Sequence, residues 1–217
     1  MKPAILYRTS QATETRVEIL RVAMDVASAE GLEGLSIGRL AAEMHMSKTG
    51  IFSHFGSKQE LQLATIEAAK RVFAERVVAP SFESPRGIPR LGTMLSSWLD
   101  YVEKIVFRGG CFFAAASAEF DSRPGPVRDQ IASLTRVWLT AIEDEINFAK
   151  STAQIQASVN AAQLGFELHA YVQEANWAFK LFDEKSAFRL ARRAIADRIR
   201  DVSADKNLKT TPKGVKR

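Results

Sequence analysis

The sequence is poor in cysteine and has no long apolar stretch. Cys111 is its single cysteine among 217 residues, which excludes a framework of internal disulfides and fits a reducing compartment. No run approaches the eighteen or so apolar residues that a membrane-spanning helix needs. The first residues lack the apolar stretch and cleavage site of a secretory signal, so we expect a cytoplasmic protein that does not contact the membrane.

The usual motifs of catalysis and metal binding are also missing. No glycine-rich phosphate-binding loop, Walker pattern or pair of catalytic carboxylates occurs. The three histidines, His45, His54 and His169, do not have the spacing of metal ligands. We therefore expect no metal, no cofactor and no enzyme activity. One enzymatic alternative depends on Cys111 and is considered below.

Positive charge is in excess, but it is concentrated at one end of the chain. The net charge is +5, and the segment from Ser203 onward holds five basic residues against Asp205 alone. The rest of the chain is nearly neutral, so the total charge does not by itself indicate nucleic-acid binding. We expect residues 203–217 to be a flexible, polar tail.

Apolar residues recur with the period of an α-helix, and no alternating strand pattern is found. With 46% hydrophobic residues the chain can bury a core, and we predict an all-α fold of about nine helices. Prolines and a glycine between residues 80 and 89 mark a domain boundary. The predicted domains are residues 14–80 and 86–202. We expect residues 1–13 to form a mobile arm, either a frayed terminus or one whose Lys2 and Arg8 reach an adjacent groove or phosphate.

The apolar stripes also place individual helices. We expect a first helix over residues 14–30, closed by Gly31, and a fourth from Ser57 to about residue 78, which ends before Pro80. Further helical segments are predicted at residues 88–106, 111–120, 127–146, 152–182 and 184–202.

Three serines between residues 36 and 58 stand where helices can begin. A serine hydroxyl accepts a hydrogen bond from the first turn of a helix, and Ser36 and Ser47 each precede a short apolar pattern. Ser57 is followed three positions later by Glu60, which is the spacing of a capping box. Two short helices joined by residues 44–46 fit a helix-turn-helix, a motif whose second helix, here about residues 47–54, lies in the DNA major groove. A simple turn followed by a solvated helix is the alternative that the spacing alone leaves open.

The segment from Thr15 to Lys70 resembles the DNA-binding domain of the TetR family of bacterial transcriptional regulators. The most specific match is His54-Phe55 followed by Ser57-Lys58 and Glu60-Leu61. The other matching residues are Ile19, Leu20, Ala23, Gly31, Leu35, Ser36, Ile37, Leu40, Ala41, Met46, Ser47, Lys48, Ile51 and Phe52. The resemblance implies a homodimer that binds double-stranded DNA in a sequence-specific manner, and in this family the regulator is usually a repressor.

Small and cationic residues on the second short helix suit close approach to phosphates and base edges. We expect Lys48, Thr49 and Gly50 to contact DNA at the front of this helix, with Ser36 at the start of the helix before it. The resemblance adds three candidate DNA-binding residues. These are His54, Lys58 and Phe52, the last of which stands where the family usually has a tyrosine, so its hydroxyl contact is lost.

The helix around residues 161–177 is apolar on more than one face, so it must be buried on two sides. Residues 188–199 offer a second apolar stripe, and the two helices suit a four-helix bundle between two chains, which is how the family pairs. A fully buried central helix in a monomer is the alternative. A dimer would read a pseudo-palindromic operator whose half-sites lie about one helical turn apart.

The second domain is rich in aromatic residues, and the resemblance implies that such residues line a cavity for a small-molecule effector. The candidate ligand-binding residues are Trp98, Cys111, Phe112, Trp138, Phe166 and His169. An ordinary packed core explains the same pattern. Cys111, expected at the start of a helix, is either a reactive thiol or a small buried residue.

Three functions remain open from the sequence. The favoured one is a ligand-responsive transcriptional regulator. The second is a DNA-binding protein without a small-molecule ligand. The third is a hydrolase with Cys111 as its nucleophile, although no histidine or acidic residue is tied to Cys111 by a known motif.

Overall fold

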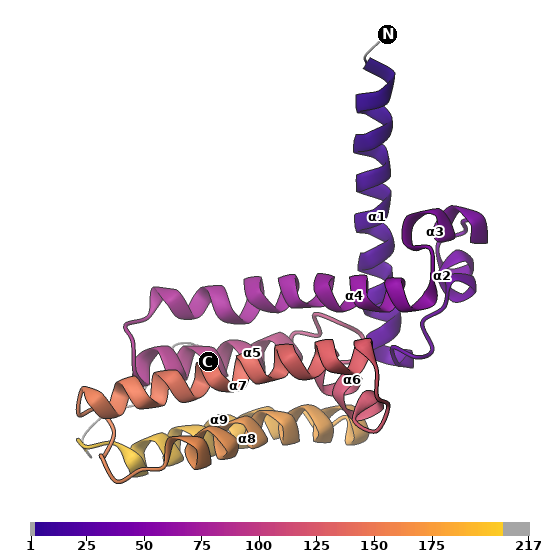
Figure 1. The fold of residues 1–217 in the computed structure, drawn as a ribbon. Coiled ribbons are helices and arrows are strands. Elements are labelled where there is room, and N and C mark those ends of the chain that lie inside the picture. Colours follow the sequence, from indigo (N-terminus) through magenta and orange to yellow (C-terminus); the bar gives the residue numbers. More distant parts are fainter. Residues whose placement is uncertain (1–2, 206–217) are drawn as a thin grey trace, which may run out of the picture. The chain divides into compact units, whose positions relative to one another are not determined.

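The computed structural model describes residues 3–205, with side chains from residue 13 onward. Over this range the chain forms nine α-helices, so the predicted all-α fold of about nine helices is confirmed (Figure 1). The helices are α1 (Pro3–Glu30), α2 (Ile37–Glu43), α3 (Lys48–Phe55), α4 (Lys58–Phe73), α5 (Ile88–Glu103), α6 (Phe112–Phe120), α7 (Pro126–Ser151), α8 (Ala161–Phe182) and α9 (Ser186–Val202).

The chain packs as two compact units. Of the described residues, the first contains 3–73 together with 105–135, and the second contains 74–104 together with 136–205. Helices α1 to α4 and α6 therefore belong to the first unit, and α5, α8 and α9 to the second. Helix α7 begins in the first unit and ends in the second.

The core of the first unit is built on the apolar stripe of α1. Ile19, Ala23 and Val26 are fully buried, as the helical spacing predicts. They pack together with buried residues of α2, α3 and α4, and with Leu32 and Leu35 of the connection between α1 and α2. The buried helix residues are Leu40, Ala41, Ile51, Phe55, Leu61, Ile66 and Ala69. This small core holds the two short helices, which could not fold alone.

Helix α1 is longer than predicted. It begins at Pro3 instead of residue 14, so the prediction of an arm without helical structure over residues 1–13 was wrong for residues 3–13. Proline is tolerated in the first helical turn, where its missing N–H costs no hydrogen bond. The sequence holds no other proline, and no glycine, before Gly31, so no strong breaker interrupts the helix.

Two backbone features fix the end of α1 in the first unit. Gly31 has a φ of +88° and ends the helix, as predicted. Gly109, in the loop before α6, donates its N–H to the Ser28 hydroxyl at 3.0 Å. A side chain at Gly109 would collide with α1, because its Cβ would lie 1.6 Å from the Ser28 carbonyl oxygen.

Helix α4 ends at Phe73, earlier than the predicted end at about residue 78, and the helical path continues in other forms. Residues Ala74–Val78 form a turn of π-helix and residues Ala79–Glu83 a turn of 3-10 helix, with Pro80 near the start of the latter. Proline is compatible with a first helical turn, so it marks a change of helix type here and not a break.

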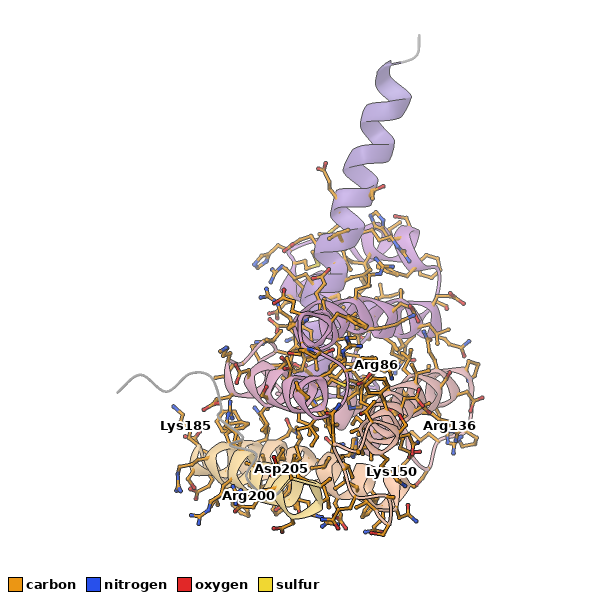
Figure 2. All side chains as sticks on the ribbon, turned by 90° about the vertical axis from the view of Figure 1, so that its left-hand side faces the viewer. Arg86, Arg136, Lys150, Lys185, Arg200 and Asp205 are labelled. Carbon is orange, nitrogen blue, oxygen red and sulfur yellow. The ribbon has the colours of Figure 1, made fainter. Side chains whose placement is uncertain are left out.

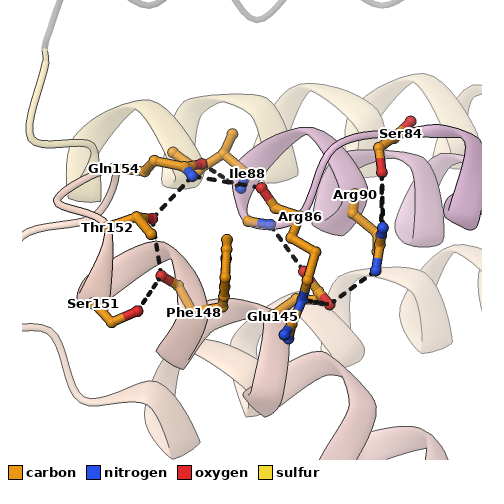
Figure 3. Close-up of polar contacts among 10 residues, drawn as sticks. Ser84, Arg86, Ile88, Arg90, Glu145, Phe148, Ser151, Thr152 and Gln154 are labelled. Carbon is orange, nitrogen blue, oxygen red and sulfur yellow. Dashed lines mark hydrogen bonds and ion pairs between the residues drawn. The ribbon is translucent and has the colours of Figure 1, made fainter.

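A buried carboxylate fixes the beginning of α5 in the second unit (Figure 3). Glu145 of α7 accepts hydrogen bonds from Arg86 Nε at 2.9 Å and from the Gly87 N–H at 2.8 Å. Gln154 Oε1 accepts the Ile88 N–H at 2.9 Å. These bonds satisfy N–H groups that the first turn of a helix leaves without an intrahelical partner. The hydrogen bonds from Arg86 and Gly87 to Glu145 thereby hold loop 84–87 against the C-terminal part of α7.

Helices α8 and α9 lie side by side in the second unit (Figure 1). The predicted apolar stripe of α9 is buried within the chain, since Phe188, Ala191, Ile195 and Ile199 are all at most 6% exposed. The prediction that this stripe is available to a second chain was therefore wrong. Helix α8 begins at Ala161, so the predicted helix over residues 152–182 starts too early; Ile155 pairs with Ser203 in a short bridge instead.

Ser203 does not belong to a flexible tail. It is fully buried, and its hydroxyl donates to the Ile199 carbonyl at 2.8 Å. The Ala204 N–H donates to the Gln154 carbonyl at 3.0 Å, so order continues past the predicted boundary. The predicted tail at residues 206–217 lies outside the described residues.

Candidate nucleic-acid interface

Each short helix of the helix-turn-helix is capped by the serine that the sequence indicated. Ser36 Oγ accepts the Arg39 N–H at 3.1 Å at the start of α2, and Ser47 Oγ accepts the Gly50 N–H at 3.0 Å at the start of α3. Such caps typically contribute about 1 kcal/mol. They matter here because α2 has seven residues and α3 has eight, too few to be stable in isolation.

Ser57 caps α4, but the capping box is only half formed. Its hydroxyl accepts the Glu60 N–H at 3.1 Å. The Ser57 N–H donates to the Phe55 carbonyl at 2.8 Å, so it is not left for the Glu60 side chain. The spacing therefore predicted the start of α4 correctly, and the reciprocal bond of the motif is replaced by a turn.

Helix α3 has one buried side and one exposed side. Ile51 is fully buried and Phe55 is 7% exposed. Lys48 and Thr49 are exposed, and Phe52, one turn after Lys48, is 52% exposed. The predicted residues of α3 thus include a short surface of cationic, hydroxyl and apolar groups. A groove-reading helix needs such groups to contact phosphates, base edges and thymine methyl groups.

The far end of α3 is held by Arg16 of α1, which the sequence analysis missed. Its guanidinium donates to the His54 carbonyl and lies over the Phe55 ring, 4.3 Å from the ring centroid. A cation near the last carbonyls of a helix is favourable. Arg16 stands three residues before the buried Ile19, on the same face of α1, and that spacing is the one signal that could have found it.

Two of the three lysine and arginine residues between positions 36 and 58 are already in ion pairs. Arg39 contacts Glu30 and Glu43, both at 2.7 Å, and the Arg39 hydrogen bond lowers the pKa of Glu30 below its ordinary value. Lys58 contacts Glu33 at 2.7 Å. Among the residues that the structure describes, no ion pair engages Lys48. Lys48 therefore presents the most available positive charge of the helix-turn-helix.

The second unit carries its own charges at scattered places. Lys185 and Arg136 lie at opposite edges of this unit in Figure 2. Arg192 contacts Asp100 and Glu103, and Arg198 contacts Glu167. The cations are thus dispersed or neutralised, which agrees with the expectation that total charge says little about the function.

The six candidate ligand-binding residues are divided between the units, with four in the second unit and two in the first. Trp98, Trp138 and His169 meet in the second unit, where the Trp98 ring lies 5.6 Å from that of Trp138 and 5.1 Å from that of His169. Burial lowers the pKa of His169, so the imidazole favours its neutral form. Phe166 is on the same helix as His169 but is 69% exposed.

The remaining two candidates belong to the first unit. Cys111 stands directly before α6, as predicted, and is 1% exposed. Phe112 is equally buried, and its ring packs against Phe107 at 6.3 Å and Phe113 at 5.4 Å. This environment is that of a packed core, which was one of the two interpretations left open for Cys111.

Among residues 13–205, no group of three or more histidine, cysteine, aspartate or glutamate side chains could hold a metal ion. No described helix combines the length and apolar character required to cross a membrane.

Comparison with known families matches both parts of the chain. Residues 19–65 match the family described as "Bacterial regulatory proteins, tetR family". Residues 87–195, about half of the chain, match the family described as "Tetracyclin repressor-like, C-terminal domain".

Individual proteins agree with these matches. Nucleoid occlusion factor SlmA of Haemophilus influenzae is 28% identical over 103 residues, which is 47% of this chain and 46% of that relative's length. A TetR transcriptional regulator from Chloroflexus aurantiacus J-10-FL superposes with a TM-score of 0.83 at 21% identity, over 89% of this chain and 98% of that one. AibR, solved with isovaleryl coenzyme A and operator DNA, superposes with a TM-score of 0.67 at 20% identity, over 83% of this chain and 95% of that one. These structural likenesses establish a common fold.

Proposed function

The chain belongs to the tetR family of bacterial regulatory proteins, and from this we propose that it is a dimeric, ligand-responsive transcriptional repressor of the cytoplasm. Each protomer places α3 in the major groove of one half-site of a pseudo-palindromic operator. Two linked DNA-binding domains bind far more tightly than one, because binding of the second domain is intramolecular.

The exposed side of α3 is the observation that supports this function most. Lys48, Thr49 and Gly50 stand at its capped start and are proposed to contact DNA together with Phe52. The family places His54 and Lys58 beside the backbone phosphates. Ser36 caps α2 with its side chain, which leaves its further hydrogen-bonding capacity for a phosphate.

The proposed DNA-binding domain spans residues 14–80, and the proposed ligand-binding and dimerisation domain spans residues 86–202. The two family matches, at residues 19–65 and 87–195, fall within these ranges and support them.

Exposed apolar side chains on α8 and α9 support the dimer. Five large ones on these helices are more than half exposed, namely Phe166, Trp177, Leu181, Phe182 and Leu190. Three of them, Phe166, Trp177 and Leu181, follow one side of α8 at intervals of whole helical turns. The opposite side of α8 is buried within the chain. An exposed apolar row of this kind is typical of a surface that a partner covers.

The effector is proposed to bind beside the ring cluster of the second unit. The rings of Trp98, Trp138 and His169 contact one another there, whereas Phe166 of the same unit is 69% exposed, and Cys111 and Phe112 belong to the first unit. AibR was solved with both a coenzyme A ester and operator DNA, so one protein of this fold binds the two kinds of ligand. An effector releases DNA only if it prefers the arrangement that does not fit the operator.

The hydrolase alternative finds no support in the structure. The Cys111 side chain is 1% exposed, so a substrate does not reach its sulfur without a local opening. A DNA-binding protein without an effector differs from our proposal in one measurable way. In that case no metabolite changes either its thermal stability or its release of DNA.

Selection of bound duplexes from a random pool tests the proposal directly. We expect enrichment of an inverted repeat, and loss of binding on addition of the correct metabolite. The Lys58→Ala variant should bind all duplexes more weakly and lower the slope of log affinity against log salt by about 1, because one phosphate contact is lost. An unenriched pool would contradict the DNA-binding function, and a change of base preference alone would contradict the phosphate assignment.

A further inference from the structure

The lysine that we place on the DNA backbone is not free in this structure. Lys58 Nζ lies 2.7 Å from Glu33 Oε1, and both side chains are partly exposed. The hydrogen bond from Lys58 holds the pKa of the Glu33 carboxyl below its ordinary value, so the carboxylate is charged at neutral pH. The same ammonium group therefore has two candidate anionic partners, the Glu33 carboxylate and a DNA phosphate.

The Glu33 carboxylate is held in place from its other side. Its Oε2 atom lies 3.4 Å from Gln62 Nε2 and 3.8 Å from Arg123 Nη1. Gln62 is 5% exposed and is fixed by a second hydrogen bond, to the Leu32 carbonyl at 2.9 Å. The Glu33 N–H donates to Glu119 Oε1 at 3.0 Å. Gln62 and Arg123 thus offer the Glu33 carboxylate contacts other than Lys58, and the backbone of Glu33 is held by Glu119.

The position of Lys58 makes a nearby anion favourable. It is the first residue of α4, where the helix dipole disfavours a cation. Glu33 offsets this effect in the free protein, and a phosphate would do so in the complex. The two anions repel one another, so tight contact with both at once is unfavourable. Arg123 and Gln62 remain beside Glu33 when Lys58 leaves, which lowers the cost of the exchange.

We propose that Glu33 is a positioning residue that competes with a DNA phosphate for Lys58 and thereby weakens binding to every duplex. This inference rests on the proposed function, because it requires Lys58 to contact DNA. Competition by Glu33 lowers the affinity for non-operator DNA without changing which bases α3 contacts. The protein therefore dissociates from non-operator DNA more readily than it would without Glu33.

The Glu33→Gln variant tests the proposal, since it keeps the shape and the backbone hydrogen bond to Glu119. Dissociation constants would be measured for the selected operator and for a random duplex. We expect both to fall by about two- to fivefold, the range that a partly exposed ion pair provides. The matched control is Glu67→Gln, which removes the same charge from an ion pair with Lys70 on α4, about two and a half turns beyond Lys58.

The Lys58→Ala background separates competition from simple repulsion. If Glu33 acts through Lys58, Glu33→Gln gives no gain in that background. A gain that persists without Lys58, or an equal gain from Glu67→Gln, would overturn the proposal, as would unchanged affinity in the single variant. Weaker binding by Lys58→Ala together with no effect of Glu33→Gln would reject the competition alone. No effect of Lys58→Ala would instead reject the phosphate contact of the proposed function.

Discussion

The protonation of His169 follows from its surroundings in the second unit. The imidazole lies 5.1 Å from the Trp98 ring, and burial lowers its pKa from the ordinary value. In the unfolded chain the same residue titrates near 6.5. Between the two pKa values the unfolded state binds more protons than the folded state, so acidification favours unfolding.

We expect the free energy of unfolding to fall as the pH drops below about 6.5, and the His169→Gln variant to lose this part of the pH dependence. Urea unfolding of the original protein and the variant at pH 7.5 and pH 5.5 measures the free energy of unfolding. The difference between the two proteins in the stability lost on acidification is due to His169, because they share all other ionisable groups. Equal losses of stability over this interval would contradict a buried, neutral imidazole.

The structural roles of residues near α3 could be predicted from the sequence where local spacing determines those roles. Ser36, Ser47 and Ser57 cap helices as predicted, because a cap depends on residues three positions apart. Arg16 and Glu33 were missed because their partners, His54 and Lys58, lie 38 and 25 positions away in the chain. Side-chain partners so distant depend on the packed unit and not on a local pattern.

At the scale of elements, α3 depends on α1 for its order. It has eight residues, and Arg16 supplies a hydrogen bond to its last turn and a cation–π contact with Phe55. The two interactions are together worth about 1–2 kcal/mol. A helix this short has little stability of its own to lose.

The Arg16→Ala variant should loosen α3 and weaken operator binding, even though Arg16 itself need not contact DNA. We expect amide hydrogen exchange in α3 to speed up by about tenfold, which corresponds to 1.4 kcal/mol. Arg21→Ala is the matched control, since Arg21 contacts Glu18 within α1. Unchanged exchange in α3, or the same acceleration in both variants, would show that Arg16 does not support this helix.

Helix existence was predictable for most of the chain, whereas helix type and partners were not. Apolar periodicity located all nine helices, yet Pro80 was taken as a stop because a change to π- and 3-10 helix leaves no sequence signal. The stripe of α9 was identified correctly but assigned to the wrong partner. Periodicity says that a face is buried and does not say whether the same chain or another one covers it.

At the scale of the whole molecule, the proposed function depends on a dimer, because two linked chains bind DNA far more tightly than one. One α3 helix offers a few side chains to the groove, and its affinity alone is expected to be low. The exposed row of Phe166, Trp177 and Leu181 provides a surface through which two chains can combine. The proposed operator binding, effector response and competition by Glu33 all concern this dimer.

The mass of the complex between the protein and its selected duplex is the most direct measurement of this account. Sedimentation at low salt should show two chains of 24.0 kDa on each operator and a dimer in the absence of DNA. A single chain that remains monomeric, or a protein that binds no duplex under these conditions, would contradict it.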